Sequence, residues 1–113
     1  MPRDAKNILR RAWSICTDAA EWPFVEEYQF HATRRWRFDW ADPVRMIAVE
    51  IEGVTYSTVG RHQRAGGYEG DCEKYNAAVM LGWRVLRYSP RMIERDPTGV
   101  IAQILDVAEM RIT

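Results

Sequence analysis

The stretch that most constrains the fold runs from Trp36 to Gly53, WRFDWADPVRMIAVEIEG, and its pattern predicts a β-hairpin. Its first half alternates apolar and charged residues, which is typical of a strand with one buried face. Its second half is strongly apolar, which is typical of a buried strand. The dipeptide Asp42-Pro43 between the two halves is a turn signal. We therefore expect the hairpin to form the centre of the fold.

Side-chain alternation within this hairpin brings acidic residues together. The aromatic residues of the first strand are expected to share one face: Trp36, Phe38 and Trp40. If the turn occupies Asp42–Arg45, Asp39 lies opposite or nearly opposite Ala48. Glu50 is then a diagonal neighbour of Asp39 at roughly 7–8 Å between Cα atoms, and Glu52 shares its face. Three carboxylates are therefore expected to converge at one end of a buried hairpin.

Carboxylates this close to one another need a compensating charge. Like charges in a buried setting are costly unless they are protonated or bound to a cation. A divalent metal ion accounts for such a cluster, and ligation by oxygen atoms alone favours Mg²⁺ or Mn²⁺. The sequence therefore predicts a metal site on the hairpin.

The rest of the chain is expected to surround this hairpin with helices and further strands. Helices are predicted at residues 4–21, at 69–81 and from Asp96-Pro97 onward, strands at 24–32 and 83–88, and a long polar loop at 53–68. A strand, a helix and a strand in succession form a right-handed crossover, so residues 83–88 are expected in a central strand parallel to residues 46–52. The order α-β-β-β-α-β-α predicts a single α/β domain over residues 1–113, with a mixed sheet and helices on both faces.

Charge and cysteine usage restrict the partners and the compartment. The formal net charge is zero, so overall charge gives no argument for nucleic-acid binding. Fourteen of the sixteen basic residues are nevertheless arginine, which suits paired contacts with phosphates. Cys16 and Cys72 have no metal-binding spacing and are expected as buried free thiols, and neither a signal peptide nor a membrane-spanning run is evident. We therefore expect a cytoplasmic protein without a membrane partner.

The predicted succession resembles the restriction-endonuclease-like, or PD-(D/E)xK, nuclease superfamily, which places acids on the second and third strands of a meander before a helix and a parallel strand. The motifs Val49-Glu50-Ile51-Glu52-Gly53 and Gly82-Trp83-Arg84-Val85-Leu86-Arg87 are similar to small phage or bacterial endonucleases related to very-short-patch-repair enzymes. The resemblance covers roughly residues 24–93. It implies a restriction-endonuclease-like core and a metal-dependent endonuclease that hydrolyses phosphodiester bonds in DNA.

The resemblance also assigns roles to the acids. Asp39 matches the first acid of the superfamily and Glu50 the second, so both are expected to bind Mg²⁺ or Mn²⁺. The peptide carbonyl of Ile51 is an expected further ligand, and Glu27 matches an additional acid that many members place near the first strand. From its position alone, Glu27 is equally well explained as a solvated glutamate at a strand edge.

The third position of the motif departs from the superfamily, because it holds Glu52 where lysine is usual. Some restriction enzymes of the superfamily also carry glutamate there, so Glu52 remains a candidate catalytic residue. Lys74 can supply the missing charge, since the lysine moves to a neighbouring helix in some members. His62, in the long loop, titrates near neutral pH and is the other candidate. Spacing does not decide between them, and each is also explained as a solvated surface residue.

Contacts with DNA are expected from arginines near the acids. Arg61 and Arg64 lie in the loop that follows the acidic strand, and Arg35 lies with two further arginines at the turn before Asp39. The expected partner is duplex or branched DNA, and the terminal helix is a candidate surface for a homodimer. The missing motif lysine leaves two alternatives: a catalytically degenerate nucleic-acid-binding or interaction module on the same fold, and a structural protein whose acids merely solvate a strand end.

Overall fold

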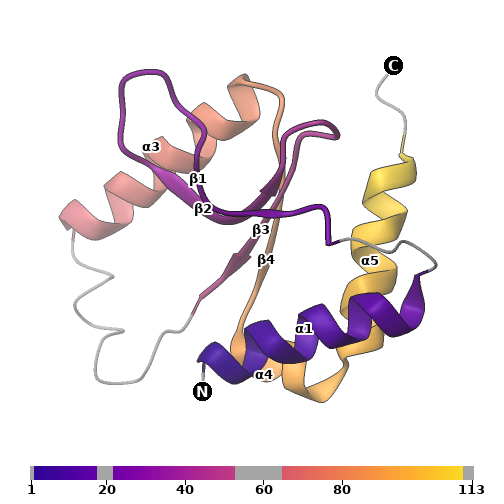
Figure 1. The fold of residues 1–113 in the computed structure, drawn as a ribbon. Coiled ribbons are helices and arrows are strands. Elements are labelled where there is room, and N and C mark those ends of the chain that lie inside the picture. The colour runs from indigo at the N-terminus through magenta and orange to yellow at the C-terminus, as the bar shows by residue number, and fades with distance from the viewer. Residues whose placement is uncertain (1, 18–21, 53–64, 111–113) are drawn as a thin grey trace.

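The computed structural model describes residues 2–17, 22–52 and 65–110 of the chain. Its elements, in chain order, are α1 (Pro2–Cys16), β1 (Val25–Gln29), β2 (Arg37–Asp42), β3 (Ile47–Ile51), α3 (Ala65–Met80), β4 (Arg84–Tyr88), α4 (Pro90–Arg95) and α5 (Pro97–Glu109) (Figure 1). The α/β class and the expected order are confirmed for the described residues, which contain one additional helix, α4.

The four strands form one sheet in the order β1-β2-β3-β4. Strands β1, β2 and β3 pair antiparallel as a meander, as their alternation and short connections predicted. Strands β3 and β4 pair in parallel, with Glu50 beside Arg87, so the predicted crossover through α3 is confirmed. The expectation that the last strand is central was wrong, because within the described residues β4 pairs with β3 alone and forms an edge of the sheet.

Helices cover both faces of the sheet, as predicted (Figure 1). On one face α3 packs over a smaller core cluster, formed by Phe38, Ala41, Ala48, Ala78 and Trp83. On the other face α1, α4 and α5 pack around a larger cluster that includes Leu9, Trp40, Ile47, Ile93, Ile101 and Ile104. The alanine side chains under α3 occupy little volume, so this helix lies close to the sheet and its polar side chains reach β3.

The turn of the hairpin lies one residue later than expected and changes the strand register. Residues 43–46 form the turn, and Met46 has a φ of 58°, which removes it from the strand. The buried Asp42 side chain stabilises the turn, because its Oδ1 accepts hydrogen bonds from the N–H groups of Val44 and Arg45 at 3.0 and 3.3 Å. Ala48 therefore pairs with Ala41 rather than with the expected Asp39.

The alternation of side chains along β2 is interrupted near its start. Phe38 packs in the cluster under α3, whereas Trp40 packs in the cluster on the opposite face, so the expectation that they share a face was wrong. The adjacent strand is distorted at the same level, where Glu27 has a φ of 51°. An irregular backbone at this level changes the direction of the neighbouring side chains. A strict two-residue alternation cannot predict such a change.

Element boundaries also differ from the predictions. Helix α1 ends at Cys16 rather than at residue 21, and α3 begins at Ala65 rather than at residue 69. The unpredicted helix α4 forms because Ser89 caps it, accepting a hydrogen bond from the Met92 N–H at 3.1 Å. Cys16 and Cys72 are free, but the expectation that both are buried was wrong, because Cys16 is exposed and Cys72 is only half-buried. No helix in the described part of the chain is long and apolar enough to span a membrane.

Candidate functional site

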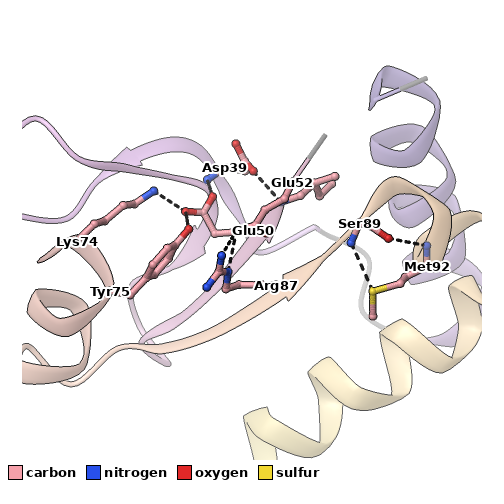
Figure 2. Close-up of polar contacts among 9 residues, drawn as sticks. Asp39, Glu50, Glu52, Lys74, Tyr75, Arg87, Ser89 and Met92 are labelled. Atoms are coloured by element: carbon pink, nitrogen blue, oxygen red, sulfur yellow. Dashed lines mark hydrogen bonds and ion pairs between the residues drawn. The ribbon is translucent and has the colours of Figure 1, made fainter. Parts of the chain in front are cut away.

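Strands β2 and β3 hold the two acids of the candidate site side by side. Continuing the observed register by one residue places Asp39 opposite Glu50. The Asp39 N–H donates to Glu50 Oε2 at 3.1 Å, and the Ile51 N–H donates to Asp39 Oδ2 at 2.7 Å (Figure 2). Each carboxylate thus accepts a charge-assisted hydrogen bond from the backbone of the neighbouring strand, which fixes both side chains against the sheet.

Helix α3 brings two further side chains onto Glu50. Lys74 Nζ lies 2.6 Å from Glu50 Oε1, and the Tyr75 hydroxyl donates to the same oxygen at 3.1 Å (Figure 2). The pair is shielded from water, because the side chains of Glu50 and Lys74 are only 6% and 17% exposed. A buried ion pair is tolerated when additional hydrogen bonds satisfy its atoms, as the Tyr75 hydroxyl and the Asp39 N–H do here.

A second ion pair lies beside the first, between Arg87 of β4 and Glu52 at the end of β3. Arg87 Nε donates to Glu52 Oε1 at 2.7 Å, and Nη2 contacts the same oxygen. The Arg87 guanidinium carbon lies 4.4 Å from the ring centroid of Tyr75, and Lys74 Nζ lies 5.2 Å from that centroid. Tyr75 therefore connects the two ion pairs through its ring and its hydroxyl.

Burial decides the protonation properties of the site. It raises the pKa of Glu50 above the ordinary glutamate value, although the hydrogen bond and positive charge of Lys74 act in the opposite direction. Burial, followed by the charge of Glu50, raises the pKa of the Tyr75 phenol, so this group stays protonated and remains a donor. Burial lowers the pKa of Arg87, but the ion pair with Glu52 outweighs it and the net shift is upward.

The structure brings together three of the residues that the sequence singled out: Asp39, Glu50 and Lys74. Lys74, one of the two candidates for the missing motif lysine, contacts Glu50. Three candidate residues lie outside the described part of the chain: Arg61, His62 and Arg64. The core of the site therefore consists of two acids from the sheet and one lysine from the helix that covers it.

The remaining candidate residues lie around this core. Glu27 is exposed on β1, and it forms no hydrogen bond or ion pair with the described residues. Glu52 contacts Arg87 rather than the other acids. The Ile51 N–H donates a hydrogen bond to Asp39. Its carbonyl stays a predicted ligand of the metal ion. Arg35 is exposed in the connection between β1 and β2.

The expected cluster of three carboxylates is not formed in the described residues. Within residues 2–17, 22–52 and 65–110, no group of three or more acidic, histidine or cysteine side chains is placed to hold a metal ion. The reason is the direction of Glu52, whose side chain contacts Arg87 (Figure 2). The charge that compensates Glu50 in this structure is the ammonium group of Lys74.

Sequence reasoning missed the contributions of Tyr75 and Arg87. Tyr75 was not among the candidate residues, although it adjoins Lys74 in the sequence. Arg87 could have been found from the parallel pairing, because a strand that pairs in register with β3 places a side chain beside Glu50.

Comparisons of the chain with protein-family models, with curated proteins and with solved structures found no match.

Proposed function

We propose that the protein is a metal-dependent endonuclease with a restriction-endonuclease-like core, which hydrolyses phosphodiester bonds in DNA. The observation that carries this proposal is the contact of Lys74 Nζ with Glu50 Oε1 at 2.6 Å, beside Asp39 on the adjacent strand. Two acids and a lysine are the chemical groups of the PD-(D/E)xK arrangement. Here the lysine comes from α3 rather than from the position of Glu52.

The donor set fits Mg²⁺ or Mn²⁺. Mg²⁺ is usually held by one or two carboxylates together with water and substrate phosphates, so the side chains of Asp39 and Glu50 are sufficient protein ligands. The Ile51 carbonyl is the proposed third oxygen. When bound, the ion supplies charge neutralisation at the phosphate and lowers the pKa of a water molecule.

The residues of the chain itself position the substrate and its charge. The backbone hydrogen bonds to Asp39 and Glu50 fix the direction of both carboxylates before any substrate binds. The Lys74 ammonium can donate to an anionic phosphate oxygen and neutralise the charge that develops there in the transition state. Lys74 and the Tyr75 hydroxyl both donate to Glu50 Oε1. When Lys74 donates to the phosphate instead, the hydrogen bond from Tyr75 still holds this oxygen in place.

The proposed context is a cytoplasmic protein that acts on duplex or branched DNA, with a homodimer as the arrangement that would cut two strands. Arg61, Arg64 and Arg35 remain the proposed contacts with the DNA backbone. Glu27 and His62 remain proposed accessory residues, as an additional acid and as a proton carrier or phosphate contact.

A second candidate function is a catalytically degenerate nucleic-acid-binding or interaction module. One observation favours it: the ion pairs and hydrogen bonds within the chain already engage four carboxylate oxygens, both of Glu50, Oδ2 of Asp39 and Oε1 of Glu52. A module that never binds a metal ion would keep these contacts permanently. In the nuclease, Glu50 must exchange Lys74 for the metal ion.

A cleavage assay tests the first proposal. Linear, nicked and branched DNA are incubated with the wild-type protein in Mg²⁺ or Mn²⁺, and with Asp39→Asn, Glu50→Gln and Lys74→Met. Asp106→Asn, an exposed residue of α5 on the other face of the sheet, is the matched control. We expect cleavage by the wild type and the control, and a loss of at least about 100-fold in each site variant.

Circular dichroism shows whether each variant is folded. A folded wild-type protein that cleaves none of these substrates with either metal ion contradicts the nuclease proposal and supports the degenerate module. Cleavage that survives in both Asp39→Asn and Glu50→Gln would place the active site elsewhere in the chain.

A further inference from the structure

The connection between β1 and β2, together with the first residue of β2, carries a concentration of arginine next to the proposed active site. We name residues 30–37, Phe-His-Ala-Thr-Arg-Arg-Trp-Arg, the arginine loop. We propose that the arginine loop binds the phosphate backbone of a DNA duplex and directs one strand toward Asp39 and Glu50. This inference rests on the proposed function, because it names the surface that holds the substrate of that site.

The charge of the arginine loop is compensated only in part by the described residues. It contains three arginines and no acid, although the whole chain has a formal net charge of zero. Arg34 pairs with Glu73 of α3 at 3.4 Å, and both side chains are more than half exposed. Arg35 and Arg37 are exposed and form no ion pair with the described residues. Two arginines therefore remain available for an anionic partner such as a phosphodiester backbone.

Aromatic packing holds the arginine loop in one conformation. Phe30 stacks on Phe38 of the core, with ring centroids 4.0 Å apart and an interplanar angle of 7°. Trp36 lies nearly parallel to Phe30 at 6.2 Å, and the Arg34 guanidinium carbon lies 4.0 Å from the Trp36 ring centroid. The backbone is fixed as well, because His31 Nδ1 accepts the Arg34 N–H at 3.0 Å. A preorganised loop loses little conformational entropy when it binds.

The arginine loop is connected to the site from two directions. Through Phe30 it packs on Phe38, which directly precedes Asp39 in β2. Through the Arg34–Glu73 pair it contacts α3 one residue before Lys74. Figure 1 shows the loop between β1 and β2 beside α3. A DNA backbone bound to this loop therefore passes close to the lysine and the acids.

The packing also distinguishes a duplex from a single strand. Proteins that hold single strands offer aromatic rings on which unpaired bases stack. In the arginine loop, Phe30 packs nearly parallel to both Phe38 and Trp36, and the Arg34 guanidinium lies over the ring of Trp36. The rings of the loop are half-buried and stabilise it, whereas the three arginine side chains are exposed. We therefore expect binding to phosphates, with little dependence on base sequence.

A DNA-binding assay without metal ions separates this inference from catalysis. Fluorescence anisotropy of a labelled duplex in EDTA is measured over a range of salt concentrations for the wild type and for Arg35→Gln/Arg37→Gln. The matched control is Arg91→Gln/Arg95→Gln, which removes two exposed arginines from α4 on the opposite face of the sheet. Each lost phosphate contact lowers the slope of log affinity against log salt by about 0.9, so the loop variant should lose about 1.8 and the control close to none. A single strand of the same sequence should compete more weakly than the duplex.

Each outcome bears on the inference. No binding of duplex by the wild type, or equal slopes for the loop variant and the wild type, would overturn it. An equal loss in the control variant would show non-specific attraction and would overturn it as well. Stronger binding of the single strand would contradict the duplex assignment. If the loop variant loses affinity as expected while no cleavage occurs with Mg²⁺ or Mn²⁺, the loop binds DNA and the nuclease proposal alone fails.

Discussion

Replacing Lys74 with methionine should destabilise the protein strongly at neutral pH. Methionine keeps most of the apolar stem of lysine but removes the ammonium group that lies 2.6 Å from Glu50 Oε1. Glu50 then remains as a buried carboxylate, with only the Tyr75 hydroxyl and the Asp39 N–H as partners among the described residues. A charge that loses its partner inside a protein is far more costly than the intact pair was favourable.

The structure gives the size of the effect. Removing one partner of a buried ion pair costs about 3–5 kcal/mol, and Glu50 is only 6% exposed, so little water is available to replace Lys74. Two hydrogen bonds to the carboxylate persist, and the carboxyl group can bind a proton, so we expect the lower end of this range, about 3 kcal/mol. For a chain of this length, that corresponds to a decrease of roughly 10 °C in the melting temperature.

The effect should depend on pH in a defined direction. Burial already raises the pKa of Glu50 above its value in an unfolded chain, so the folded state binds the proton more tightly and stability falls as pH rises through this interval. Without Lys74 the pKa rises further, because the lysine is the main group that lowers it. The difference in stability between Lys74→Met and the wild type should therefore be small at about pH 4 and largest at about pH 8.

Urea unfolding, followed by far-ultraviolet circular dichroism, measures the free energy of unfolding at about pH 4 and about pH 8. The proteins compared are the wild type, Lys74→Met, Glu50→Gln and the double variant. The double variant replaces both charges by neutral groups of similar shape, so it should be more stable than Lys74→Met. A loss of less than about 0.5 kcal/mol at about pH 8 in Lys74→Met would show that the ion pair is absent in solution. A loss that does not change with pH would refute the explanation through Glu50.

Three further predictions concern stability, and each is measured by the same unfolding experiment. Tyr75→Phe removes one hydrogen bond to the Glu50 carboxylate and should cost about 1–2 kcal/mol, whereas no change would mean that this hydrogen bond is not formed. Asp42→Ala removes a buried side chain that accepts hydrogen bonds from two N–H groups of the turn, and it should lower the free energy of unfolding by about 2 kcal/mol. The pH dependence assigned to Glu50 should stay the same, and a change in it would contradict that assignment. Gly82→Ala forces a side chain into a φ of 92° after α3 and should cost about 1–2 kcal/mol, although no atom lies within 4 Å of the new methyl group; an unchanged stability would show that the backbone relaxes.

The element order and the parallel pairing of β3 with β4 could be predicted from the sequence, because each depends on patterns that extend over many residues. The apolar run of β3 and the helical segment after it leave few ways to connect to the strand at Arg84–Tyr88. Glu50 could be found because it interrupts an otherwise apolar strand, and Asp39 because it is a charged position of the alternating strand that precedes the turn. The position of α4 was missed because its six residues are too short to show a period.

The register and the faces of the hairpin could not be predicted, because both depend on single backbone angles. Met46 leaves the strand through a φ of 58°, which moves the turn and brings Asp39 opposite Glu50 rather than opposite Ala48. The distortion at Glu27 accompanies the change of face between Phe38 and Trp40. Neither positive angle is signalled by residue type, since methionine and glutamate rarely adopt it.

The acids were expected to need a metal ion as their compensating charge, but in this structure Lys74 already neutralises Glu50. A metal ion at Asp39 and Glu50 has to compete with this ammonium group, so Mn²⁺ should raise the melting temperature of Lys74→Met by more degrees than that of the wild type. In a nuclease the wild type must also show a measurable increase, and Glu50→Gln must abolish it. In a degenerate module, Mn²⁺ should raise the melting temperature of Lys74→Met alone, because the acids become accessible to the ion only when the lysine is removed. An increase of equal size in all three proteins would place the Mn²⁺ site away from Glu50 and would contradict both accounts of the ion pair.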